Sequence, residues 1–106
     1  MSKHILEELF ETIEARKGSD ANKSYVASLH AKGTKKIAEK VAEETTEAII
    51  EAVTGNKEKL AEESADLLFH LMILWSDAGL KPNDIFDILK SREGIGGLDE
   101  KASRNI

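Results

Sequence analysis

The sequence predicts an all-α fold, a bundle of four to five helices with a central antiparallel helix hairpin. Three observations favour it: apolar residues recur every three or four positions, no stretch alternates strictly between apolar and polar residues, and short polar or glycine-containing breaks separate the periodic segments. The 106 residues fit one domain, 1–106, with a glycine-containing C-terminal tail at 94–106. The core of so short a chain is small.

Two helices are predicted in the first third of the chain. The first covers about residues 3–16 and ends before Gly18, because glycine is typical just beyond a helix end. Its apolar positions are Ile5, Leu6, Leu9, Phe10 and Ile13. Ser24 can cap a second, short helix through its side-chain oxygen, and this helix is expected to stop at Gly33.

Three more helices are predicted after Gly33. Thr34 is expected to cap a helix at about 35–53, and a tight turn at 54–56 connects it to a helix at about 57–78. Pro82 suits the first turn of a last helix at about 82–92. The apolar positions expected in the first and last of these helices include Ile37, Val41, Ala48, Ile49, Ile85, Phe86 and Leu89.

The segment 66–75 is apolar on every helical face. Eight of its ten residues are apolar. A helix that is apolar all round must be buried all round, and the helices of one short chain can hardly cover it. We therefore expect a homodimer built around this helix, with a well-wrapped monomer core as the alternative.

Composition and charge exclude several classes of protein. The net charge of −5 argues against general nucleic-acid binding, and its concentration in residues 39–66, with nine acids and three bases, favours binding of cations. No apolar run approaches the roughly 18 residues that a membrane helix needs, and the N-terminus lacks a signal-peptide core. The absence of cysteine excludes disulfides, thiolate catalysis and zinc–thiolate sites. A cytoplasmic protein is expected.

Two pairs of acids in this acidic window are placed to converge. Glu44 and Glu47 are three residues apart, as are Glu63 and Asp66, so the members of each pair share a helix face. If the hairpin turns at Gly55, both pairs lie at the same height along the two antiparallel helices. Glu44 and Glu63 also interrupt apolar stripes, so their carboxylates should point toward the core.

Carboxylates crowded in this way repel one another, and at least one is expected to protonate unless a divalent cation binds. A ligand set made only of oxygen atoms favours Mg²⁺, with Mn²⁺ as a possible substitute. The alternative is a solvated acidic helix face without a metal. A di-iron site is excluded because none of the three histidines has a glutamate three residues before it. His70 is expected to be a core or interface residue.

At this point the sequence resembles a known family. The run Glu43-Glu44-x-x-Glu47 followed by Glu63-x-x-Asp66 is similar to the motif of the all-α (MazG-like) nucleoside triphosphate pyrophosphohydrolases. Its flanks, at 24–29, 32–33, 37, 40–47, 63–71 and 94–101, resemble the phosphoribosyl-ATP pyrophosphohydrolase family within that group. The similarity covers nearly the whole chain, which makes it specific.

The resemblance implies hydrolysis of phosphoribosyl-ATP to phosphoribosyl-AMP and pyrophosphate, the second step of histidine biosynthesis. It also implies that Mg²⁺ is bound by four acids: Glu44, Glu47, Glu63 and Asp66. Two other readings stay open, a house-cleaning dNTP or dUTP pyrophosphohydrolase of the same superfamily and a non-enzymatic helical dimerisation module.

The remaining site residues are expected to serve the substrate. Glu43 and Glu44 are candidates for the catalytic base, although Glu43 could also be simply exposed. Four basic residues are candidate phosphate ligands: Lys36, Lys40, Lys101 and Arg104. For Lys40 the alternative is a helix salt bridge with Glu44, and for the last two it is a disordered terminus. Tyr25 could stack on a base or serve packing alone.

Overall fold

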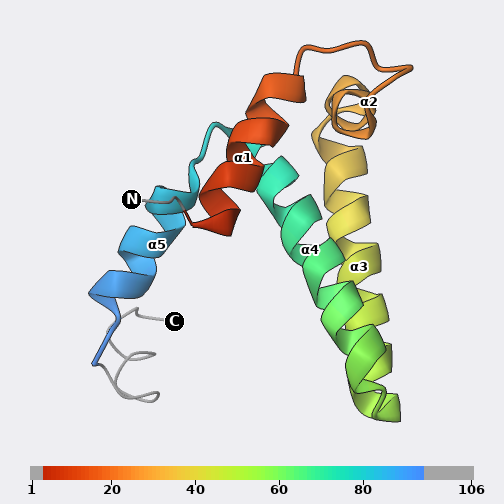
Figure 1. Ribbon diagram of the computed structural model, residues 1–106, viewed down its shortest axis with the longest axis vertical. Coiled ribbons are helices and arrows are strands. Elements are labelled where there is room, and N and C mark those ends of the chain that lie inside the picture. Colours follow the sequence, from red (N-terminus) through yellow and green to blue (C-terminus); the bar gives the residue numbers. More distant parts are fainter. Residues whose placement is uncertain (1–3, 95–106) are drawn as a thin grey trace.

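The computed structural model describes residues 4–94, and this part of the chain is all-helical (Figure 1). Its elements are α1 (Ile5–Arg16), α2 (Tyr25–Lys32), α3 (Thr34–Thr54), α4 (Lys57–Ala78) and α5 (Pro82–Ser91). The predicted fold class is confirmed, and the predicted helix ends are within two residues of those observed. None of the helices in the described range has the length and apolarity needed to cross a bilayer.

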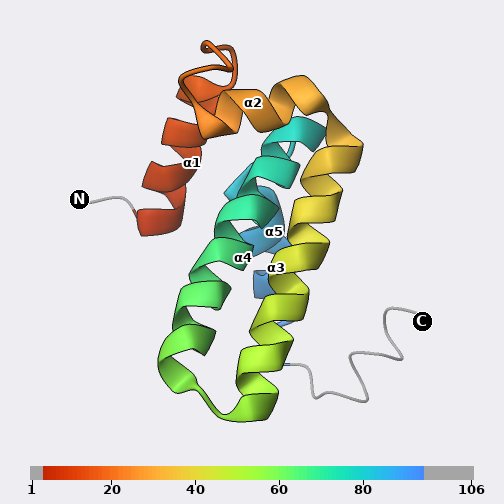
Figure 2. The same ribbon diagram turned by 90° about the vertical axis from the view of Figure 1, so that its right-hand side faces the viewer.

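Helices α3 and α4 form the central antiparallel hairpin (Figure 2). Gly55 ends α3 with φ +79°, a left-handed conformation that glycine adopts without the steric cost of a Cβ atom. Asn56 caps the start of α4, because its side-chain oxygen accepts a hydrogen bond from the backbone N–H of Lys59 at 3.0 Å. The turn therefore needs only these two residues, which fixes the register of the two helices.

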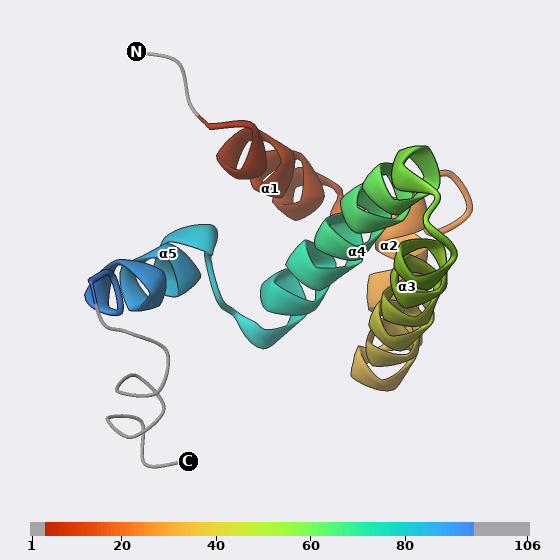
Figure 3. The same cartoon turned by 90° about the horizontal axis from the view of Figure 1, so that it is seen from below.

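The core lies at the end of the hairpin remote from Gly55. Helix α2 crosses this end (Figure 2), and α4 lies between α1 and α3 (Figure 3). The buried apolar cluster draws on four helices and comprises Phe10, Ile13, Val26, Leu29, Ile37, Met72 and Ile73. Within residues 4–94 the half of the hairpin near Gly55 has no such cover, and Val53 there is 81% exposed.

Two details of the prediction were wrong. Thr34 does not cap α3: the capping position belongs to Gly33, whose φ of +95° lets α2 end and α3 begin without a spacer residue. The Thr34 hydroxyl instead donates to Asp77 Oδ2 on α4 at 2.5 Å. Leu89, an expected inward position of the last helix, is exposed, because the described part of the chain places no element over that face of α5.

Candidate metal centre

Three carboxylates meet between α3 and α4. One oxygen from each of Glu44, Glu63 and Asp66 lies within 4.8 Å of the other two. Glu44 comes from α3, and the other two come from adjacent turns of α4. A turn at Gly55 predicts this meeting point. Both helices rise by the same distance per residue, so residues the same number of positions from the turn lie at the same height.

Two of these carboxylates each have one oxygen that is buried away from hydrogen-bonding water. Glu44 is 7% exposed, although it is ionisable, because it interrupts the apolar stripe that faces the hairpin interior. Glu44 Oε2 and Glu63 Oε2 are buried, and no donor within residues 4–94 reaches either atom. Buried polar oxygens without a partner are costly, so this arrangement favours a bound cation or proton.

The fourth acid of the motif, Glu47, is outside the set of three converging oxygens but acts on it from α3. Its carboxyl group is close enough to those of Glu63 and Glu44 to share a proton with them when no cation is present. The hydrogen bond to Glu47, partial burial and the surrounding charges raise the pKa of Glu63 to about 7. Burial, followed by the charge of Glu47, raises the pKa of Glu44. The expected protonation of a crowded acid is thus confirmed in direction.

Lys40 and Glu43 lie at the exposed side of the acidic group. Lys40 Nζ is 3.0 Å from Glu43 Oε2 and 3.9 Å from Glu44 Oε1. The hydrogen bond between them raises the pKa of Lys40 and lowers that of Glu43. The predicted salt bridge between Lys40 and Glu44 is therefore present, but Lys40 lies closer to Glu43 than to Glu44. A groove lined by Ala42, Glu43, Thr46 and Glu47 opens beside this pair.

Of the other candidate phosphate ligands, Lys36 is within the described residues, and it is not brought to the acidic group. Lys36 lies one turn before Lys40 on α3 and pairs with Glu39 at 3.6 Å. Lys101 and Arg104 lie outside the described residues.

The sequence did not reveal that α2 also reaches the acidic group. The Tyr25 hydroxyl lies 2.7 Å from His70 Nε2, and His70 Nδ1 lies 2.8 Å from the backbone oxygen of Asp66. His70 is buried, as expected for a core histidine. The Tyr25 ring stacks on Phe69 with a centroid distance of 6.4 Å. Only the spacing of Asp66 and His70, one helical turn, was visible in the sequence.

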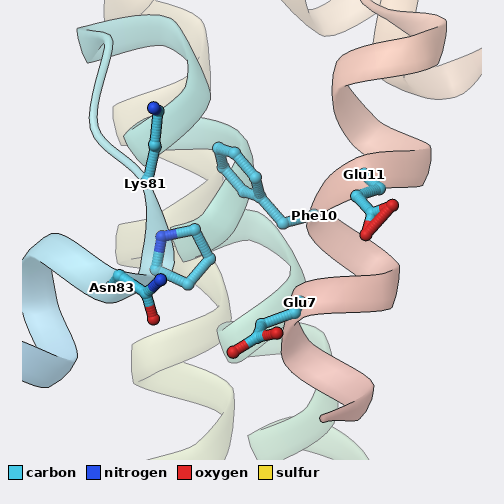
Figure 4. Close-up of a pocket in the computed structure, with 6 residues that line it drawn as sticks. Glu7, Phe10, Glu11, Lys81 and Asn83 are labelled. Carbon is cyan, nitrogen blue, oxygen red and sulfur yellow. The ribbon is translucent and has the colours of Figure 1, made fainter. Parts of the chain in front are cut away.

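A second pocket lies away from the acids, between α1 and the start of α5 (Figure 4). Phe10 and Pro82 give it apolar walls, and the remaining lining residues are Glu7, Glu11, Lys81 and Asn83. Because none of the converging carboxylates lines it, this pocket is separate from the candidate metal centre.

Comparison with known proteins gives one consistent result. Residues 6–93 match the family model described as phosphoribosyl-ATP pyrophosphohydrolase. A relative from Azospirillum brasilense is 52% identical, over 98% of this chain and 94% of its own. One from Erythrobacter litoralis (strain HTCC2594) is 50% identical, over 95% and 97%. One from Gluconobacter oxydans (strain 621H) is 48% identical, over 94% and 75%. Each is named phosphoribosyl-ATP pyrophosphatase.

Proposed function

Because this chain belongs to the phosphoribosyl-ATP pyrophosphohydrolase family, we propose that it hydrolyses phosphoribosyl-ATP to phosphoribosyl-AMP and pyrophosphate, the second step of histidine biosynthesis. The names of its relatives support the substrate. The observation that carries the proposal is the pair of buried carboxylate oxygens, Glu44 Oε2 and Glu63 Oε2, that no donor reaches within the described residues. A triphosphate substrate brings the cation that such a site needs.

The acidic group fits Mg²⁺, with Mn²⁺ as a possible substitute. All its donors are carboxylate oxygens, which hard divalent cations prefer, and three of them are already within 4.8 Å of one another. The residues that would hold the ion are Glu44, Glu47, Glu63 and Asp66. When bound, Mg²⁺ neutralises negative charge on the substrate phosphates and on the departing pyrophosphate.

The chain's own residues prepare the attacking water. The water oxygen forms a bond to the α phosphorus, the bond from that phosphorus to the bridging oxygen breaks, and pyrophosphate leaves with the bonding electrons. The proton lost by the water goes to a carboxylate, for which Glu43 and Glu44 are the candidates. The lowered pKa of Glu43 keeps it ionised, and the raised pKa of Glu44 makes it the stronger base of the two.

Basic residues would hold the phosphates. Lys40 is the best placed, because its ammonium group lies at the exposed side of the acids and can turn from Glu43 to a phosphate oxygen. Lys36, Lys101 and Arg104 complete the proposed set of phosphate ligands.

Pyrophosphate release from phosphoribosyl-ATP, with Mg²⁺ and with a chelator, tests this function. We expect release that depends on Mg²⁺ and exceeds the release from each member of a panel of dNTPs and dUTP. Release from the panel alone would keep the site and assign the protein to nucleotide house-cleaning. No release from any nucleotide would leave the helical dimerisation module as the better account.

We also propose a homodimer. Among the described residues, the large apolar side chains left exposed include Ile49, Ile50 and Val53 on α3, Leu68 on α4, and Ile88 and Leu89 on α5. A second copy would cover such a surface and complete the burial of segment 66–75. Sedimentation equilibrium should give about twice the 11.7 kDa mass of one chain, and a monomer mass would exclude the dimer.

The cytoplasmic location likewise stays a prediction, which a reporter fusion would test.

A further inference from the structure

A chain of two hydrogen bonds connects α2 to the acidic helix hairpin. It runs from the Tyr25 hydroxyl to His70 Nε2, at 2.7 Å, and from His70 Nδ1 to the backbone oxygen of Asp66, at 2.8 Å. His70 is 6% exposed, and its ring makes edge contacts with Tyr25 and with Phe69. The imidazole is therefore held in one orientation by contacts on several sides.

The direction of both hydrogen bonds follows from their chemistry. A backbone carbonyl oxygen can only accept, so His70 Nδ1 carries the hydrogen and donates it to Asp66. In the neutral ring Nε2 then holds a lone pair, so the Tyr25 hydroxyl donates to it. The hydroxyl hydrogen of Tyr25 is thereby used, and its oxygen can only accept any further hydrogen bond.

This oxygen lies within electrostatic reach of the candidate metal centre. Charges from both sides of the hairpin act on the Tyr25 hydroxyl, those of Lys40, Glu43 and Glu44 on α3 and that of Asp66 on α4. Burial, reinforced by the three carboxylates, raises the pKa of Tyr25, so the hydroxyl keeps its hydrogen for His70. Tyr25 is nevertheless 49% exposed, so a molecule bound at the acids can reach it.

Because the Tyr25 oxygen can only accept a further hydrogen bond, its partner must be a hydrogen-bond donor. Phosphate oxygens and ionised carboxylates are also acceptors, so Tyr25 cannot bind either of them directly. The ammonium group of Lys40 is a donor, but it pairs with Glu43 at 3.0 Å and, in the proposed function, turns from there to a phosphate oxygen. Among the groups that react, the attacking water is the one that can donate a hydrogen bond.

We propose that Tyr25 contacts the attacking water: its hydroxyl oxygen, oriented by His70, accepts one hydrogen of that water while Glu43 or Glu44 takes the other as a proton. With both hydrogens held, a lone pair of the water is free to form the bond to the α phosphorus as pyrophosphate leaves. His70 is a positioning residue that acts through Tyr25. The inference rests on the proposed hydrolytic function of the acidic site.

Steady-state kinetics of Tyr25→Phe test the contact, since this variant loses the hydroxyl and keeps the ring. We expect kcat to fall about tenfold, the usual worth of one hydrogen bond, with KM unchanged. An unchanged kcat would overturn the proposal. So would a rise in KM alone, because Tyr25 would then act on binding, for example by placing Lys40.

A double-mutant cycle tests the role of His70. His70→Asn keeps a donor for the Asp66 oxygen but offers Tyr25 no acceptor at the position of Nε2. In the Tyr25→Phe background this change should lower kcat less than about twofold, because the group through which His70 acts is already absent. His70→Gln, which restores an acceptor, should retain more turnover than His70→Asn. If the losses of kcat in the two single variants multiplied in the double variant, His70 would not act through Tyr25, and its assignment as a positioning residue would be wrong.

The tautomer of His70, on which the orientation of the Tyr25 hydroxyl depends, can be determined without substrate. Nitrogen-15 NMR of the wild-type protein should show the neutral His70 ring protonated at Nδ1, and protonation at Nε2 would overturn the inference. If the wild type hydrolysed only other nucleoside triphosphates, the cycle would be run on those. If it hydrolysed none, the proposed function would fail while the tautomer still reported on the hydrogen-bond chain.

Discussion

Glu44→Gln and Glu63→Gln are expected to lower turnover of phosphoribosyl-ATP at least about a hundredfold. Loss of groups that merely orient metal ligands typically costs 10–100-fold, so loss of a ligand should cost more. The same variants should melt at a higher temperature than the wild type when metal is absent, since a neutral amide avoids both the cost of burying a charged carboxylate and the repulsion between neighbouring acids. Steady-state kinetics and thermal melts measured on the same preparations would show both effects.

A matched control exists on α4. Glu62 is an exposed acid next to Glu63 in the sequence, and it does not belong to the converging group. Glu62→Gln makes the same chemical change and should leave turnover and the metal-free melting temperature close to those of the wild type. Full turnover in both Glu44→Gln and Glu63→Gln would show that the site has been assigned to the wrong residues.

The metal-free protein is expected to lose stability as the pH rises from about 5 to 8. The folded-state pKa of Glu63 is about 7, against an ordinary value of 4.5. Below 4.5 both the folded and the unfolded chain hold this proton. Between the two values the folded chain holds it more tightly, so the free energy of unfolding falls with rising pH, and above 7 the loss is complete. Glu44, whose pKa is also raised, contributes with the same sign.

Thermal melts in a chelator across this pH range would measure the effect. Mg²⁺ should restore the melting temperature most at pH 8, where the carboxylates are ionised and bind it best. Glu63→Gln should flatten the profile, whereas Glu62→Gln should keep the wild-type slope. The lowered pKa of Glu43 has the opposite sign, but it acts below the pH window in question. A melting temperature that rose from pH 5 to 8 without metal would contradict this electrostatic account.

The sequence sufficed for the parts of the structure that depend on local rules. Helix ends followed from residues with a defined conformational role, such as Gly55 and Asn56 at the hairpin turn. Because that turn is short and helices rise by a fixed amount per residue, the approach of Glu44 to Asp66 could be predicted by counting.

Other parts depend on how the helices pack, which local patterns do not encode. The position of α2 over the end of the hairpin brings Tyr25 to His70, 45 residues later in the chain, and no spacing rule connects the two. The hydroxyl of Thr34 resembled a helix cap in the sequence, yet it donates to Asp77 because Gly33 already occupies the capping position. Periodicity likewise places Leu89 on the apolar face of its helix, but it does not show which element covers that face.

Binding of Mn²⁺ to the metal-free protein, followed through the electron paramagnetic resonance signal of the free ion, tests the central claim most directly. We expect the wild type and Glu62→Gln to remove Mn²⁺ from solution in a saturable manner and to release it when Mg²⁺ is added. Glu63→Gln should bind markedly more weakly. No uptake by the wild type, or equal uptake by Glu63→Gln, would contradict the assignment of a divalent-metal site to the carboxylates between α3 and α4.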